Sequence, residues 1–95
     1  MTMADLVRDQ VFRAFKLAYG ERLTDETLEA AVKHPGETHR AAEVKGAVCV
    51  IFTEYGGLSQ YGNNEFWKEL NPLLAAHGLY YEWLDGGTAT IWPIF

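Results

Sequence analysis

Cysteine is almost absent from this chain of 95 residues, since Cys49 is the only one. A single cysteine excludes an internal disulfide. Cys49 lies within the apolar run of residues 47–52, and apolar surroundings raise the pKa of a thiol and leave it unreactive. We therefore expect a buried structural thiol and no nucleophilic catalysis by this residue.

Long hydrophobic runs are missing too. The longest, residues 47–52, is far shorter than the ~20 residues that a helix needs to cross a bilayer. The N-terminal segment carries Asp5, Arg8 and Asp9 where a secretory signal would have an apolar core. The sequence thus predicts a single cytoplasmic domain over residues 1–95, with no membrane partner.

Basic residues are scarce. Eight Lys and Arg residues stand against thirteen Asp and Glu, and the resulting net charge of -5 disfavours direct binding to a nucleic-acid backbone. After Lys45 the only basic side chain is Lys68. An acidic C-terminal half of this kind suits a partner protein with a basic surface, although ordinary solubility explains the same excess of acid.

Motifs for metals, cofactors and acid–base catalysis are lacking as well. The three histidines are dispersed, and no cysteine pair or closely spaced His/carboxylate motif supports a metal site. Asp85 is explained by a turn, and Glu82 has no identifiable opposite carboxylate. We therefore expect no metal, no cofactor and no catalytic residue, and hence a protein that is not an enzyme.

Helical periodicity and capping signals predict an αα-hairpin over residues 1–36. Apolar residues follow helical spacing over residues 5–19, and Gly20 is typical of a helix C-terminus. Thr24 is a natural N-cap for a second helix, which should reach about His34 because Pro35 follows. Residues 37–45 are polar, and either a helical turn or a loop is compatible with them.

The remainder, residues 46–95, is predicted to be a βαββ unit. The apolar, β-branched run at 47–53 indicates a buried strand. A helix follows, capped by Asn63 or Asn64 and closed by Gly78. Pro72 should kink this helix or start a second turn after Asn71. Residues 79–85 and 88–95 then form a β-hairpin that turns on two glycines.

The expected fold class is α+β, with a small three-stranded mixed sheet. A right-handed crossover would make the strands at 47–53 and 79–85 parallel neighbours. Pro93 has no N–H to donate, which favours an edge position for the last strand. The strand at 79–85 should then lie in the middle of the sheet.

Aromatic residues gather in the C-terminal half and supply the candidate interface. A two-residue turn would pair Asp85 with Thr88, Trp83 with Thr90 and Tyr81 with Trp92, so that three aromatic rings share one face. Either the N-terminal helices cover these rings as core, or part of the surface is exposed to a partner. The candidate partner-binding residues are Tyr81, Glu82, Trp83 and Trp92, together with Glu65 and Glu69.

The glycine-rich loop at 56–64 is the alternative ligand site. Gly57 and Gly62 are spaced as in a phosphate-binding loop between a strand and a helix. Asn63 and Asn64 follow, so the lysine and hydroxyl that hold phosphate and magnesium in such loops are missing. A flexible connection would account for the same glycines.

Three hypotheses of function follow. The first is a non-enzymatic acidic protein-binding module, an inhibitor or adaptor resembling phage anti-defence or antitoxin proteins only in size and charge. The second is a small-ligand or nucleotide-binding domain that uses the loop at 56–64. The third is a homo-oligomeric structural protein whose hairpin pairs with itself.

Overall fold

Two capped helices begin the chain in the computed structural model, which describes residues 2–38 and 40–94. Helix α1 spans Met3–Tyr19, where Thr2 and Asp5 form a reciprocal capping box, and Gly20 ends the helix at a φ of 70°. Helix α2 spans Asp25–Ala31, and the Thr24 hydroxyl accepts a hydrogen bond from the Thr27 N–H. The predicted αα-hairpin and the cap at Thr24 are confirmed.

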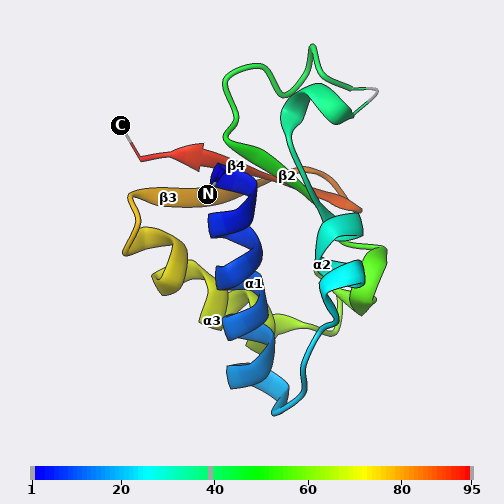
Figure 1. Ribbon diagram of the computed structural model, residues 1–95, viewed down its shortest axis with the longest axis vertical. Coiled ribbons are helices and arrows are strands. Elements are labelled where there is room, and N and C mark those ends of the chain that lie inside the picture. The colour runs from blue at the N-terminus through cyan, green and yellow to red at the C-terminus, as the bar shows by residue number, and fades with distance from the viewer. Residues whose placement is uncertain (1, 39, 95) are drawn as a thin grey trace.

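A four-stranded antiparallel sheet follows the hairpin (Figure 1). Its strands are β1 (Val32–Lys33), β2 (Cys49–Phe52), β3 (Leu79–Asp85) and β4 (Thr88–Pro93), in the order β1-β2-β4-β3. Helix α3 (Asn64–Ala75) lies between β2 and β3 in sequence, and short 3₁₀ helices occur at Pro35–Glu37 and Tyr55–Gly57. The α+β class is confirmed, and α3 continues through Pro72 as one helix.

The predicted strand order is wrong, because β4 and not β3 is central. Strands β2 and β3 are not neighbours, and each pairs antiparallel with β4. Pro93 is the last residue of β4 and lies beyond Ile91, which pairs with Cys49 at the start of β2. A proline thus keeps its own position out of the sheet interior, but it does not require the whole strand to lie at the edge.

Strand β1 was not predicted from the sequence. Helix α2 ends at Ala31 and not near His34, and Val32 and Lys33 then pair with Ile51 and Val50 of β2. The strand has only two residues, too few for an alternating pattern to reveal it. This fourth strand makes β2 an interior strand of the sheet.

The hairpin turn was predicted correctly, but the pairing beyond it was not. Asp85 pairs with Thr88 as expected, whereas an irregularity at Leu84 brings Trp83 opposite Ala89 and Tyr81 opposite Ile91. A one-residue shift moves side chains to the other face of a sheet. Trp92 therefore lies on the opposite face from Tyr81 and Trp83.

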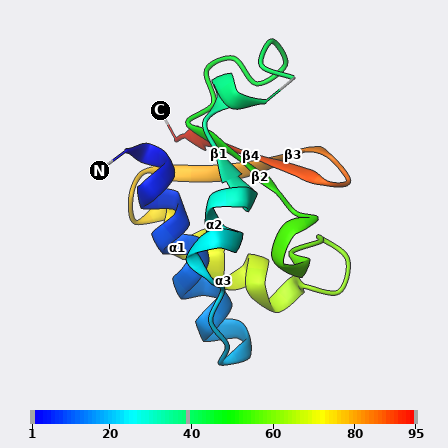
Figure 2. The same cartoon turned by 45° about the vertical axis from the view of Figure 1, so that its right-hand side comes forward.

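The two faces of the sheet are covered differently. All three helices lie on one face, and the connection from β1 to β2 passes over the other (Figures 1 and 2). The helix-covered core is built around the fully buried side chains of Val7, Val11, Ile51, Leu58, Phe66, Leu70, Leu74 and Ile91. On the other face, Val44 and Val50 are buried outside this core.

The polar segment at 37–45, for which helix and loop were both open, consists mainly of turns. The N–H of Glu43 donates to the Arg40 carbonyl, and that of Val44 donates to the Ala41 carbonyl, in successive i to i+3 bonds. The Val44 side chain is fully buried. His39 and Phe95 lie outside the described residues.

Candidate functional site

The predicted partner-binding residues do not form one surface. Tyr81 and Trp83 are half-buried and pack on Trp67 of α3, with ring centroids 5.0 and 4.7 Å from that ring. Trp92 is half-buried on the other face of the sheet, where its indole N–H donates to the Thr90 hydroxyl at 2.8 Å. Exposed Glu82 shares that second face, because it pairs with Thr90.

The remaining two candidates, Glu65 and Glu69, lie on α3 in the helical layer. The six residues thus fall into three groups, on the two sheet faces and on α3. The aromatic rings nearest the helices contribute to packing, since Tyr81 and Trp83 extend a cluster around Trp67 and Phe66.

The glycine-rich loop is held by Asn63. Its amide donates to the carbonyls of Gly57 and Ser59 at 2.9 and 2.8 Å, and its carbonyl oxygen accepts a hydrogen bond from the Tyr19 hydroxyl at 2.7 Å. Asn63 occupies the N-cap position of α3 but makes no side-chain capping bond, and Asn64 is already the first helical residue. The predicted N-cap position at Asn63 is confirmed, but its side chain makes no capping bond because the amide bonds to the loop.

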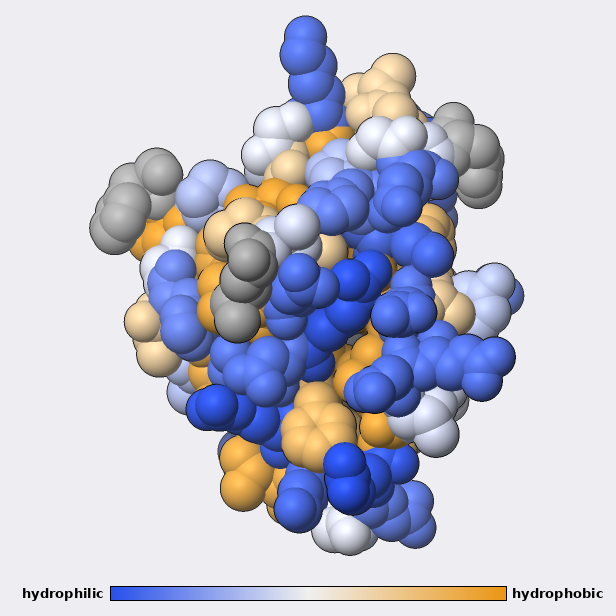
Figure 3. All heavy atoms as spheres, in the orientation of Figure 1, coloured by the Kyte–Doolittle hydropathy of each residue, from blue (hydrophilic) through white to orange (hydrophobic). Residues whose placement is uncertain are grey.

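A cleft of about 400 Å³ lies between α1 and α2. In Figure 3 it is a hollow with hydrophilic residues around its rim and a hydrophobic patch at its floor. Helix α1 contributes residues spaced as one helical face, and α2 contributes a second such face. The lining residues are Asp5, Arg8, Asp9, Phe12, Arg22, Asp25, Leu28 and Glu29.

Arg8 is the most constrained charge in the cleft. One guanidinium nitrogen donates to the Val32 carbonyl at 2.7 Å, and another donates to the Asp5 carboxylate at 3.2 Å. Its Nε is buried and has no hydrogen-bond partner among the described residues. Arg8 therefore links α1 to the short strand β1 and holds one end of the cleft.

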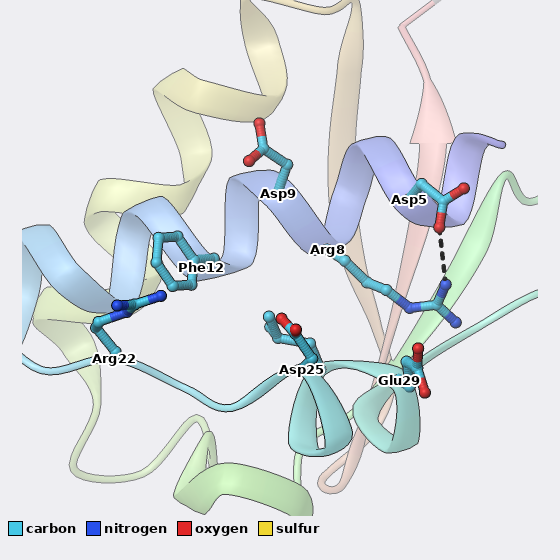
Figure 4. Close-up of a pocket in the computed structure, with 8 residues that line it drawn as sticks. Asp5, Arg8, Asp9, Phe12, Arg22, Asp25 and Glu29 are labelled. Carbon is cyan, nitrogen blue, oxygen red and sulfur yellow. Dashed lines mark hydrogen bonds and ion pairs between the residues drawn. The ribbon is translucent and has the colours of Figure 1, made fainter. Parts of the chain in front are cut away.

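Asp5 and Asp9 are also engaged within α1. Hydrogen bonds from the N–H and hydroxyl of Thr2, with a smaller effect of Arg8, hold the pKa of the Asp5 carboxyl below its ordinary value. Asp9 forms an ion pair with Arg13 at 3.2 Å and points away from α2 (Figure 4). Neither carboxylate is free to become the main contact of a ligand.

Asp25 and Glu29 are different. They lie one turn apart on α2 and face α1 across the cleft (Figure 4). Within residues 2–38 and 40–94, neither side chain has a hydrogen-bond or ion-pair partner in the structure. Two free carboxylates at the mouth of a cleft attract a cationic group.

The cleft also contains apolar surface. Leu28 is buried, Phe12 is half-buried, and the guanidinium carbon of Arg22 lies 5.4 Å from the centre of the Phe12 ring. A cation over an aromatic face is a favourable arrangement, so this ring already interacts with one cation from its own chain. The site combines apolar stem-binding surface with free negative charge.

Sequence reasoning did not identify this cleft. The spacing of Asp5, Arg8 and Phe12 on one helix, and of Asp25 and Glu29 on the next, places each set on a helical face. That signal alone does not distinguish a solvated face from a cleft wall. The decisive information is tertiary, because it requires knowing that the two faces oppose each other.

Cys49 is fully buried, as predicted, and burial raises the pKa of its thiol to about 12. A thiol with this pKa is protonated at neutral pH. No three His, Cys, Asp or Glu side chains within residues 2–38 and 40–94 are grouped in a way that could hold a metal ion. In the same part of the chain, every helix is too short or too polar to span a membrane.

No protein family, curated protein or solved structure matches the chain. Fold and site therefore define only a class, a small α+β domain with a polar cleft between two helices.

Proposed function

We propose that the protein is a non-enzymatic protein-binding module, an inhibitor or adaptor, that holds a basic side chain of its partner in the cleft between α1 and α2. The observation that carries the proposal is the pair of unpartnered carboxylates, Asp25 and Glu29, beside the apolar surface of Phe12 and Leu28. The overall charge of -5 adds long-range attraction for a basic partner.

A lysine or arginine side chain matches this combination in chemical terms. Its aliphatic stem can cover Phe12 and Leu28 while its charged head reaches Asp25 and Glu29. A guanidinium can donate two parallel hydrogen bonds to one carboxylate, which makes arginine the better fit. Because the cleft is open to solvent, we expect one such contact to be modest and a partner with several basic residues to bind more tightly.

The direct test uses a short arginine-rich peptide with blocked termini. NMR titration should shift backbone amides of α1 and α2 around the cleft, and leave the β3–β4 hairpin largely unchanged. The variant Asp25→Asn/Glu29→Gln should weaken binding about tenfold, because each exposed pair contributes up to ~1 kcal/mol. Both changes keep the size and hydrogen-bonding shape of the side chains.

The matched control is Glu21→Gln/Glu26→Gln. It removes the same two charges from exposed positions, one before α2 and one in its first turn, that do not line the cleft. If the control weakens the peptide as much as the cleft variant does, the attraction comes from net charge and the proposal fails. If only the cleft variant loses binding, it becomes the negative bait for identifying the natural partner by affinity capture and mass spectrometry.

A further inference from the structure

Strand β3 forms one outer edge of the sheet, because the strand order is β1-β2-β4-β3. The opposite edge is β1, which has only two residues, whereas β3 has seven. Among residues 2–38 and 40–94, β3 pairs with β4 alone. Its sequence contains neither lysine nor proline, the two residues that commonly protect edge strands from further pairing. Of the two edges, only β3 is long enough to receive another strand.

The hydrogen bonds on the inner side of β3 identify the backbone groups that point outward. The Ile94 N–H donates to the Gly78 carbonyl at 2.8 Å, just before β3 begins. In an antiparallel pair every second residue bonds across the pair, so Glu82 also directs its N–H and C=O groups towards β4. The register is regular up to Trp83. The N–H and C=O groups of Tyr81 and Trp83 therefore point away from β4, and no described residue bonds to them.

This edge carries one negative charge between two aromatic rings. Glu82 is exposed on the sheet face opposite the helices, and it has no ion-pair partner in the described part of the chain. Tyr81 and Trp83 are half-buried on the helix face. Side chains that lie opposite each other on paired strands meet on the same face. An added strand would thus meet apolar surface on one face and a carboxylate on the other.

We propose that the edge of β3 binds an extended segment of a partner protein, added antiparallel, in which a basic residue lies between two apolar residues. The basic side chain lies opposite Glu82. The two apolar residues lie opposite Tyr81 and Trp83 and exchange hydrogen bonds with their outward N–H and C=O groups. In strand addition of this kind the backbone bonds supply affinity, and the alternating side chains supply specificity.

A second copy of the chain fits this edge less well. A two-fold axis through Glu82 would pair Tyr81 with Trp83 of the other copy, but it would set the two Glu82 carboxylates directly opposite each other. An axis through Tyr81 avoids that opposition but requires the backbone of Leu79, which is only 3% exposed. Glu82 therefore disfavours self-pairing and favours a cationic residue from a different chain.

A peptide with blocked termini, in which a lysine lies between two valines and threonines flank the valines, tests the proposal. NMR titration should shift the amides of Tyr81 and Trp83, and bound peptide should slow their hydrogen exchange. N-methylation of both valines removes the donors that face β3 and should weaken binding at least roughly tenfold. N-methylation of the lysine is the matched control, because its N–H points away from β3 and binding should be retained.

Exchanging the charges tests the register. Glu82→Lys should weaken binding of the lysine peptide roughly fivefold, and should favour a peptide with glutamate in place of the lysine. Glu26→Lys is the control variant, because it makes the same change of charge at an exposed position in the first turn of α2. This control should bind the lysine peptide nearly as the wild type does.

The proposal does not depend on the cleft between α1 and α2, because no residue of β3 lines that cleft. The cleft variant Asp25→Asn/Glu29→Gln should therefore bind the lysine peptide as the wild type does, even if the arginine-rich peptide binds neither. A peptide that shifts neither Tyr81 nor Trp83 at millimolar concentration overturns the proposal. So does a peptide with methylated valines that binds as well as the unmodified one, or binding that only the cleft variant loses.

Discussion

The two faces of the sheet differ in how their side chains are covered. On one face, β2 and β4 direct Cys49, Ile51, Ala89 and Ile91 into a core completed by three helices. On the other, a connection built largely of turns contributes the buried side chain of Val44, β2 contributes buried Val50, and Trp92 is only half-buried. The number of aromatic residues in the hairpin therefore does not by itself indicate which of its two surfaces is available to a partner.

Replacing one tryptophan on each side of the sheet should show most clearly how much each face contributes to the free energy of unfolding. Trp67 is 5% exposed, contacts Phe66, Tyr81 and Trp83, and donates its indole N–H to the Leu58 carbonyl at 3.0 Å. Trp67→Ala should lower the free energy of unfolding by ~3–5 kcal/mol. Trp92→Ala should lower it by only ~1–2 kcal/mol.

Urea denaturation of both variants, followed by circular dichroism, measures these losses. Equal losses would mean that the connection at 34–48 contributes as much as the helices, and would remove the distinction between the faces. If Trp67→Ala does not fold, Trp67→Phe keeps most of the ring while losing the bond to Leu58, and supplies the comparison instead.

Cys49 offers a pH-dependent test of the helix-covered face. Burial raises the pKa of its thiol from 9.0 to about 12, so the unfolded chain loses this proton at lower pH than the folded chain does. The stabilisation is complete below pH 9 and is lost as pH rises from about 9 towards 12, by at most ~1.4 kcal/mol per pH unit.

Lysine and tyrosine titrate over the same pH range, so the measurement compares wild type with Cys49→Ala. The stability advantage of the wild-type chain should shrink over this window. In addition, a polar thiol reagent should modify Cys49 only after denaturant is added. Rapid labelling of the folded chain at neutral pH would show that water reaches the face beneath the helices.

The sequence allowed the local features of both faces to be predicted. Thr24 capped α2, the run at 47–53 contained β2, and Asp85 paired with Thr88, because each depends on neighbours in the chain. The irregularity at Leu84 and the two-residue β1 have no periodic signature.

Strand order and the cleft depend on contacts between distant segments. Strand β4 is interior because it pairs with β2 on one side and β3 on the other, and its residues from Thr88 to Ile91 are all buried. Nothing local in these small and β-branched residues distinguishes an interior strand from an edge strand. The cleft has no local signal either, because the hydrogen bond from Arg8 to the Val32 carbonyl joins segments that are distant in the sequence.

The N-cap of α2 should have a smaller effect than the core residues. Thr24→Ala removes the acceptor for the Thr27 N–H and should cost ~1 kcal/mol of stability. Thr24→Ser keeps that acceptor and should behave nearly as the wild type. Denaturation of both variants measures the difference, and a serine variant as destabilised as the alanine variant would show that the threonine methyl, and not the cap, supports α2.

The smallest expected effect concerns the ion pair that joins the connection from β1 to β2 to the β3–β4 turn. Arg40, in the connection, bonds to Glu43 and to Asp85 at the β3–β4 turn, and all three side chains are at least partly exposed. The Gly87 N–H, followed by Arg40, holds the pKa of the Asp85 carboxyl below its ordinary value. This stabilisation is present above the ordinary pKa of an aspartate and is lost as pH falls through the lowered value.

Arg40→Gln should therefore raise the pKa of Asp85 only in part, because the larger contribution of Gly87 remains. NMR titration of the Asp85 carboxyl carbon measures the change, with Lys45→Gln as a control that removes a charge from the same connection. Thermal stability should fall only slightly above the titration range, and the two chains should converge on acidification, since Asp85 is then neutral in both. An Asp85 pKa that is the same in wild type and Arg40→Gln would mean that the connection does not rest on the hairpin turn. The sheet face that this connection covers would then be more accessible to solvent than its buried valines indicate.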